Sequence, residues 1–110
     1  MKNYWIYIMS NKSRTVYYIG VTNDIQRRTF EHKTLTGSTF ASNFNCTQLL
    51  YSDEFNNIND AITQEKRLKK WKRSWKDKLI KENNPNFIDL AGDWFEPEDI
   101  KASRFLPSQE

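Results

Sequence analysis

Two short segments near the start of the chain, 3–10 and 15–21, are rich in aromatic and β-branched residues. Residues of these types favour β-strands, and the polar run 11–14 that separates them is typical of a turn. Two strands joined so closely in sequence pair antiparallel far more easily than parallel, because a parallel pair needs a long crossover. The beginning of the chain therefore predicts a β-hairpin.

This hairpin carries tyrosines that share a face. A tight turn would set Tyr7 opposite Tyr18, whereas a register shifted by one residue would substitute Tyr17. Gly20 comes just before the end of the second strand, where a missing side chain lets a ligand or another backbone approach closely. The hairpin thus predicts a tyrosine-lined surface beside an open backbone position.

A helix is expected after the hairpin. Either Asn23 or Asp24 can serve as its N-cap, and the pattern continues to about Lys33. Arg28 and His32 are four residues apart and so lie on one face of this helix. We expect that face to point back at the sheet, which would bring both side chains towards the tyrosines.

The rest of the chain predicts one α+β domain. In order, it holds a loop at 34–47 that is anchored by Phe40 and Phe44 and has room for a short helical turn, a strand at 48–52, a helix at about 60–70, and a helix from Trp75 to about Glu82 capped by Ser74. The order β-β-α-β-α-α indicates a small, mainly antiparallel three-stranded sheet flanked by helices. Residues 1–90 form this domain, and 91–110 form an acidic tail that either packs on it or is partly flexible.

Glu65 is the notable residue of the helix at 60–70. It falls in the same helical stripe as Ala61 and Leu68, so its carboxylate lies within the arc that faces the domain. A buried carboxylate is costly unless a cation meets it. Glu65 is therefore a candidate for binding a cation or a basic side chain.

Composition limits the cofactors and the setting of the protein. The chain has 110 residues, one Cys and one His, so neither an internal disulfide nor the four N or S ligands of a structural zinc site are expected. A metal here would be a hard, oxygen-bound ion such as Mg²⁺ or Mn²⁺. We find neither a secretory signal nor a membrane span, so a cytoplasmic protein with no membrane partner is expected.

Charge is concentrated between residues 66 and 81, where nine basic residues accompany Asp77 alone. Clustered Lys and Arg gain affinity for polyanions by releasing counterions, so this segment predicts a nucleic-acid surface, although a solvated helix face would look the same. The candidate binding residues are Lys66, Lys69, Lys70, Lys72, Arg73 and Lys76. We expect Trp71 and Trp75, which lie between them, to belong to the core.

Together these residues resemble the GIY-YIG endonuclease superfamily, and within it the small stand-alone bacterial proteins. Trp5-Ile6-Tyr7 stands where the first motif would be, Tyr18-Ile19-Gly20 is the second motif, and their tyrosines are eleven positions apart. The resemblance continues through VTNDIQRR, EHK, AITQEKRLKKWKR and NPNFIDL, and covers about residues 4–95. The chain departs from the pattern at Trp5, which replaces a glycine, and carries His32 where relatives have tyrosine or histidine.

The resemblance implies a metal-dependent DNA endonuclease with low sequence specificity that acts in DNA repair, recombination or processing. It implies that Tyr7 or Tyr18 acts as general base or orients the water, and that Arg28 holds the scissile phosphate. It further implies that His32 accepts or relays a proton and that Glu65 binds one Mg²⁺ or Mn²⁺. Branched and nicked DNA are candidate substrates, while the oligomeric state stays open.

Two other functions fit the same residues. The first is a nucleic-acid-binding module that keeps the fold but relies on the basic segment 66–81 and does not turn over. The second is a protein-interaction domain whose basic segment docks an acidic partner or the acidic tail 91–110 of the same chain. The endonuclease needs metal and Tyr7, whereas the nucleic-acid-binding module needs neither.

Overall fold

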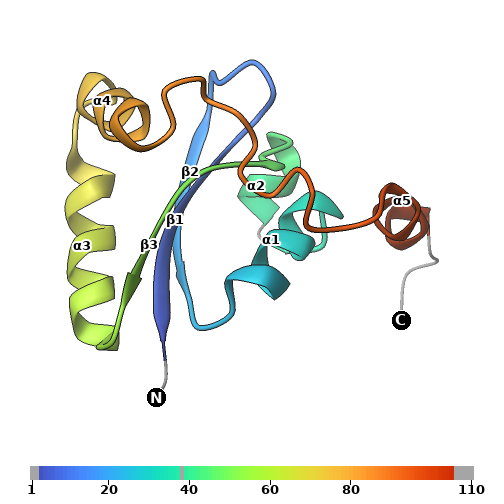
Figure 1. Cartoon of the computed structure of the whole chain (residues 1–110), viewed down its shortest axis with the longest axis horizontal. Helices are drawn as coiled ribbons and strands as arrows, with labels where there is room; N and C mark the ends of the chain where they lie inside the picture. Colours follow the sequence, from blue (N-terminus) through green and yellow to red (C-terminus); the bar gives the residue numbers. More distant parts are fainter. Residues whose placement is uncertain (1–2, 38, 106–110) are drawn as a thin grey trace.

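A computed structural model describes residues 3–37 and 39–105, and within them three strands form one antiparallel sheet with helices on both faces (Figure 1). The elements are β1 (Tyr4–Ser10), β2 (Tyr17–Thr22), α1 (Ile25–Lys33), α2 (Thr39–Asn43), β3 (Gln48–Phe55), α3 (Ile58–Lys70), α4 (Arg73–Asn83) and α5 (Pro97–Phe105). The predicted α+β class and the three-stranded sheet are confirmed. The short helix α2 lies within the predicted loop, which left room for a helical turn, and α5 was not predicted.

Strand β1 is the centre of the sheet, which has the order β2-β1-β3. Side chains alternate between its faces, so Ile6 and Ile8 pack against Ala61 of α3, whereas Tyr7 packs on the other side. Figure 1 shows α3 on one side of the sheet and α1 and α2 on the other. A central strand covered on both faces explains why its residues 6–10 are all buried.

The hairpin register differs from the predicted one. Tyr7 pairs with Gly20, and Tyr18 pairs with Met9, so the two tyrosines are not directly opposite. The prediction that Tyr7 faces Tyr18 across the ladder is wrong by two residues. A shift of two residues keeps each side chain on its face, so Tyr7 and Tyr18 still share one, while Tyr17 packs with the α3 side.

The register shifts because the connection spans residues 11–16 instead of four residues. The side-chain oxygen of Asn11 accepts hydrogen bonds from the backbone N–H groups of Thr15 (2.9 Å) and Val16 (3.2 Å). Arg14 adopts a positive φ of 58°. Such side-chain-to-backbone bonds stabilise a wider loop than a tight turn.

The structure shows which residues begin helices α1 and α4. Asp24 caps α1, because its carboxylate accepts from the N–H of Arg27 at 3.0 Å. Helix α4 begins at Arg73, two residues earlier than predicted, and no side chain caps it. The predicted cap at Ser74 is therefore wrong. Asp77 accepts instead from the Tyr17 hydroxyl at 2.6 Å and thereby joins α4 to β2.

Three aromatic residues expected inside the domain lie at its surface. Phe40 and Phe44 are each 47% exposed and contact each other, so they do not anchor residues 34–47 in the core. Trp75 is 52% exposed, and its assignment to the core is wrong. Trp71 is partly buried against the α3-side core, as predicted.

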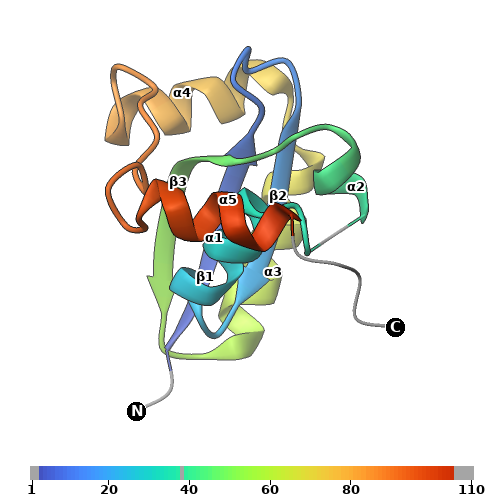
Figure 2. The same cartoon turned by 90° about the vertical axis from the view of Figure 1, so that its right-hand side faces the viewer.

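Residues 89–91, which follow α4, pack against the α1 side of the domain, whereas Phe87 packs on the α3 side. Asp89 accepts from Lys33 Nζ at 2.5 Å and from the N–H of Leu49 at 3.0 Å, and Ala91 is buried in the same cluster as Tyr7. Figure 2 shows α5 in front of α1. No helix within residues 3–37 and 39–105 is long and apolar enough to cross a membrane.

Candidate active site

Tyr7 lies at the centre of the candidate site and is almost fully buried, with 1% of its surface exposed. Its neighbour across the ladder is Gly20. A Cβ atom at Gly20 would lie 2.6 Å from Tyr7 Cζ and 2.9 Å from Tyr7 Cε1, closer than real Cβ contacts. The glycine therefore provides the space in which the tyrosine ring lies over β2.

His32 meets Tyr7 from the last turn of α1. The Tyr7 hydroxyl and His32 Nε2 are 3.1 Å apart, and the Tyr18 ring centre lies 5.1 Å from that of His32. His32 is 2% exposed, and one turn of helix separates it from Arg28. The fold brings these side chains together on one face of the sheet, as predicted.

Burial sets the protonation of the Tyr7–His32 pair. It lowers the pKa of His32 to about 4, and the positive charge of Arg28 acts in the same direction. Burial also raises the pKa of Tyr7, to which Tyr18 adds, whereas Arg28 lowers it. Near neutral pH the imidazole is neutral and the phenol is protonated.

These protonation states fix the direction of the hydrogen bond. A protonated phenol donates to the unprotonated Nε2, so Nδ1 carries the ring proton of His32. Nδ1 is buried and faces the backbone of Cys46 without a well-aligned hydrogen bond. His32 Nε2 thus accepts the hydrogen bond that the Tyr7 hydroxyl donates.

Arg28 occupies the exposed side of this pair. Its side chain is 33% exposed, and its Nε lies 3.0 Å from a carboxylate oxygen of Glu31. It borders a pocket of about 260 Å³ together with residues from both faces of the sheet, Tyr4, Val21, Thr22, Asn23 and Ile58. A partly exposed guanidinium that also acts on Tyr7 is suited to binding a phosphate.

Glu65 lies apart from the other four residues. Its helix, α3, packs on the sheet face opposite to Tyr7. Its carboxylate is 15% exposed and lies 3.5 Å from Lys69 Nζ. Within the described residues no hydrogen bond or ion pair joins Glu65 to Tyr7, Tyr18, Arg28 or His32.

The donor set limits the metal that Glu65 could hold. Residues 3–37 and 39–105 contain no group of three or more His, Cys, Asp or Glu side chains arranged around one point. A protein cage for calcium or zinc is therefore not provided there. A single carboxylate does suit Mg²⁺, which keeps several water ligands and shares its remaining positions with substrate phosphates.

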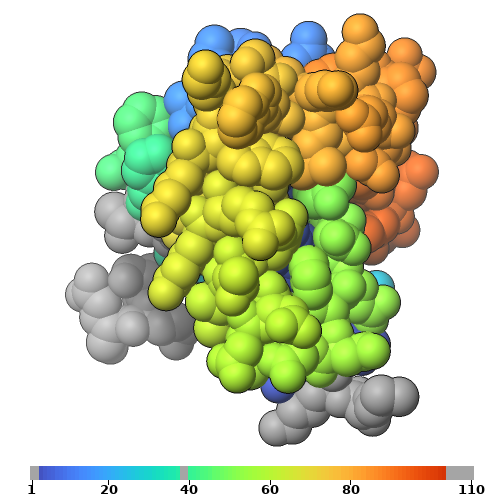
Figure 3. Space-filling view, turned by 90° about the vertical axis from the view of Figure 1, so that its left-hand side faces the viewer, coloured from blue at the N-terminus to red at the C-terminus, as the bar shows by residue number. Residues whose placement is uncertain are grey.

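The predicted basic surface lies on α3 and α4, which form one continuous surface in Figure 3. The six predicted binding residues lie on or between these helices and are exposed, apart from the half-buried Lys76: Lys66, Lys69, Lys70, Lys72, Arg73 and Lys76. Arg73 has a structural task in addition. Its guanidinium lies 3.5 Å from the Tyr17 ring centre and donates to the carbonyls of Arg14 and Thr15 and to Asp77.

One residue at the site was not predicted there. Phe40 of α2 covers Tyr18, with ring centres 6.1 Å apart, and is half exposed. The sequence places Phe40 in a polar segment with no helical or strand periodicity, so no pattern indicates this contact. Phe40 limits the access of water to the tyrosines from the α2 side.

Known proteins resemble the chain over most of its length. The family model of the GIY-YIG catalytic domain matches residues 3–79. A UPF0213 protein of Limosilactobacillus reuteri is 28% identical over 91 residues, which cover 81% of this chain and 94% of that protein. A UPF0213 protein of Lactococcus lactis is 32% identical over 96 residues, covering 82% and 91% respectively.

A solved structure also resembles the chain. The solution NMR structure of a UPF0213 protein from Bacillus halodurans matches with a TM-score of 0.49 and 23% identity, over 77% of this chain and 89% of that one. The segment matched by the family model, 3–79, contains Tyr7, Tyr18, Arg28 and His32 as well as Glu65.

Proposed function

The chain belongs to the GIY-YIG catalytic domain family, and from this premise we propose that it is an endonuclease that hydrolyses DNA phosphodiester bonds with one divalent metal ion. The observation that carries the proposal is the contact of the Tyr7 hydroxyl with His32 Nε2 at 3.1 Å beside Arg28. Hydrolysis needs a proton acceptor for water and positive charge at the phosphate. The cluster offers both.

Tyr7 and His32 act together in this proposal. The raised pKa of Tyr7 speaks against a standing phenolate as the base. Instead, the phenol oxygen takes a proton from water while the phenol gives its own proton to His32 Nε2. The water oxygen attacks phosphorus and the bond to the 3′ oxygen breaks. The proton taken from water stays on the Tyr7 oxygen, the former phenol proton lies on the imidazole of His32, and the departing 3′ oxygen takes a proton from solvent. Gly20 keeps the ring of Tyr7 in place for this transfer.

Arg28 is proposed to hold the scissile phosphate. Its two terminal nitrogens match two phosphate oxygens, and positive charge there stabilises the transition state. The contact of its Nε with Glu31 at 3.0 Å limits the rotation of the side chain. Tyr18, which contacts the rings of both Tyr7 and His32, orients the attacking water.

Glu65 is proposed as the residue that would hold Mg²⁺ or Mn²⁺, which supplies positive charge for the phosphoryl and departing oxygens when bound. Strand β2 is an edge strand, so a DNA backbone lying along it can contact both faces of the sheet. The pocket beside Arg28 already includes Ile58, the first residue of α3. Glu65 follows Ile58 by about two helical turns.

The substrate is proposed to be DNA recognised by structure. Base-specific reading usually needs an added module such as a helix-turn-helix or a zinc finger. The family model and the described elements account for most of the chain without such a module. A role in DNA repair, recombination or processing in the cytoplasm, on branched or nicked DNA, agrees with low sequence specificity.

The test is cleavage of plasmid, nicked and branched DNA in Mg²⁺ or Mn²⁺. We expect cleavage by the wild type and a loss of about 100-fold or more in Arg28→Ala and Glu65→Ala. The matched control is Arg27→Ala, which removes an exposed arginine next to Arg28 on α1. Cleavage that persists unchanged in Arg28→Ala and Glu65→Ala contradicts the proposal.

One observation favours a second candidate, a nucleic-acid-binding module without turnover. Glu65 is paired with Lys69 and lies on the opposite face of the sheet from Tyr7. A module of this kind binds DNA in EDTA, with an affinity that falls steeply with salt and does not depend on Tyr7. Binding in EDTA without any cleavage in metal supports this candidate over the endonuclease.

A further inference from the structure

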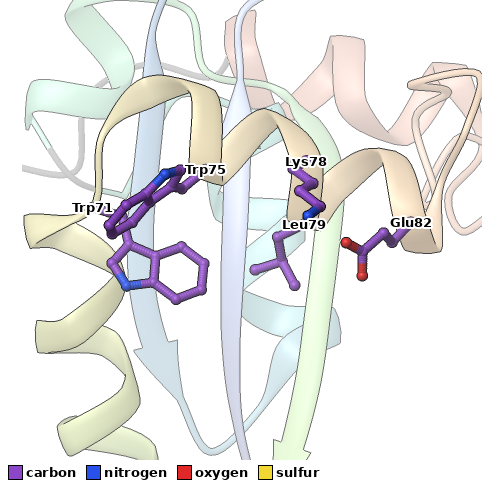
Figure 4. Close-up of a pocket in the computed structure, with 5 residues that line it drawn as sticks. All are labelled: Trp71, Trp75, Lys78, Leu79 and Glu82. Atoms are coloured by element: carbon purple, nitrogen blue, oxygen red, sulfur yellow. The ribbon is translucent and has the colours of Figure 1, made fainter.

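Helix α4 presents an apolar pocket that the proposed reaction does not use. The pocket has a volume of about 390 Å³ and is lined by Trp71, Trp75, Lys78, Leu79 and Glu82 (Figure 4). The two indoles meet edge to face with ring centres 6.0 Å apart. Trp75 is 52% exposed, although a smaller polar residue is the usual choice where a helix faces solvent.

A second, positively charged pocket lies on the other side of Lys78. It has a volume of about 550 Å³, and its cations are Arg14, Arg73, Lys78 and Lys81. Arg73 pairs with Asp77, which is the acid of this pocket. Lys78 and Lys81 form no ion pair with any residue that the structure describes. An anion can therefore bind between these two lysines.

We propose that α4 binds one unpaired nucleotide, with its base against Trp75 and its phosphate between Lys78 and Lys81. Lys78 borders both pockets and so fixes their order along the nucleotide. Glu82 closes the far side of the apolar pocket, and its charge repels phosphate there. The ammonium of Lys72 lies 5.8 Å from the Trp75 ring centre and adds positive charge beside the base.

This inference rests on the proposed function for its biological meaning, because the nucleotide belongs to the DNA that the enzyme cuts. A base inside a duplex cannot stack on a protein side chain, whereas a base in a flap, a gap or a branch can. The substrate class is therefore DNA in which a single-stranded segment adjoins a duplex. The α4 site is separate from Tyr7 and His32, which lie on the other face of the sheet.

The test measures binding of two fluorescent oligomers in EDTA, a short oligothymidylate and an abasic strand with the same number of phosphates. Stacking of one base on an aromatic ring gives a loss of about 5- to 150-fold when the ring is removed. We expect Trp75→Ala to weaken the oligothymidylate by such a factor and to leave the abasic strand unchanged. Trp75→Phe restores part of the affinity.

Trp94→Ala is the matched control, since Trp94 is also exposed, at 39%, but contacts Phe95, which packs on Phe30 of α1. It changes neither affinity. Lys78→Gln weakens both strands and lowers the dependence of binding on salt by about one phosphate contact. Equal affinity of the wild type for both strands, or an equal loss of both in Trp75→Ala, overturns the proposal.

A third ligand separates nucleic acid from an acidic protein partner. If polyglutamate displaces the oligothymidylate as effectively as the abasic strand displaces it, the surface binds by charge alone and base stacking is overturned. Cleavage assays keep this proposal apart from the endonuclease proposal. Base-dependent binding without cleavage contradicts the endonuclease proposal and supports the nucleotide site. Cleavage of flapped and fully paired DNA that does not depend on Trp75 contradicts the nucleotide site alone.

Discussion

Gly20→Ala is predicted to damage both the stability and the site through one steric contact. The new Cβ would lie 2.6 Å from Tyr7 Cζ and 2.9 Å from Tyr7 Cε1, both below the closest real contacts. Tyr7 is 1% exposed in the central strand, so its ring has little room to move. Any displacement also lengthens its 3.1 Å contact with His32.

The size of the stability loss follows from two destabilising contributions and one stabilising contribution. Overpacking of a core costs about 1–3 kcal/mol, and loss of the buried Tyr7–His32 hydrogen bond costs about 0.5–1.5 kcal/mol. Replacing glycine by alanine stiffens the unfolded chain and returns about 0.4–1 kcal/mol. The net loss of unfolding free energy is about 0.5–4 kcal/mol, which lowers Tm by at least about 2 °C in a domain of this size.

The assay is urea or thermal unfolding followed by circular dichroism, with Gly37→Ala as the matched control. A Cβ at Gly37 would meet Glu31 Cβ at 3.4 Å, an ordinary contact, so no loss from packing is expected. Combining Gly20→Ala with Tyr7→Leu removes the clash, and the double variant should lose less than the sum of the two singles. Equal stability of Gly20→Ala and Gly37→Ala refutes the steric argument.

Three further predictions concern stability. The pKa of His32 is about 4 in the folded state against 6.5 in the unfolded state, so the unfolded state binds the proton first as pH falls. Urea titrations should therefore show that the wild type loses about 3 kcal/mol more unfolding free energy than His32→Gln between pH 6.5 and pH 4. An equal loss in the two proteins contradicts this prediction. Asp89→Ala removes the carboxylate that neutralises the buried Lys33, whose Nζ keeps its hydrogen bond to the carbonyl of Thr47, and costs about 3–5 kcal/mol. Asp93→Ala at an exposed position is neutral, and equal unfolding midpoints of the two variants refute this prediction. Arg73→Ala lowers Tm as well as DNA affinity, because it frees the hairpin loop from α4; a change in affinity alone shows that its role is not structural.

The sequence predicts the elements well where local pattern determines them. The strands and the helices α1, α3 and α4 lie within a few residues of their expected places, since the hydrophobic period specifies them and an Asp or Asn cap marks the start of α1 and of α3. The faces of Tyr7 and Tyr18 are also correct, because strand alternation survives a shift of two residues. The register itself depends on the hydrogen bonds of Asn11, which no periodicity indicates.

Contacts between distant segments could not be predicted in the same way. Lys33 meets Asp89 across 56 positions and Tyr17 meets Asp77 across 60, and each of these residues alone reads as an ordinary polar side chain. The exposure of Trp75 has the same origin, because α4 crosses the end of the sheet and leaves one side of its helix uncovered. For the site, local spacing brings His32 and Arg28 to the tyrosines, whereas the place of Glu65 depends on how α3 packs.

The most direct test of the endonuclease proposal is single-turnover DNA cleavage in Mg²⁺ or Mn²⁺ by the wild type, Tyr7→Phe and Tyr51→Phe. Tyr51 is also a buried strand tyrosine, but it packs on the α3 side of the sheet, so it controls for the loss of a hydroxyl in the core. We predict that Tyr7→Phe cleaves at least about 100-fold more slowly than the wild type, while Tyr51→Phe keeps the wild-type rate. Cleavage by Tyr7→Phe at the wild-type rate would contradict it.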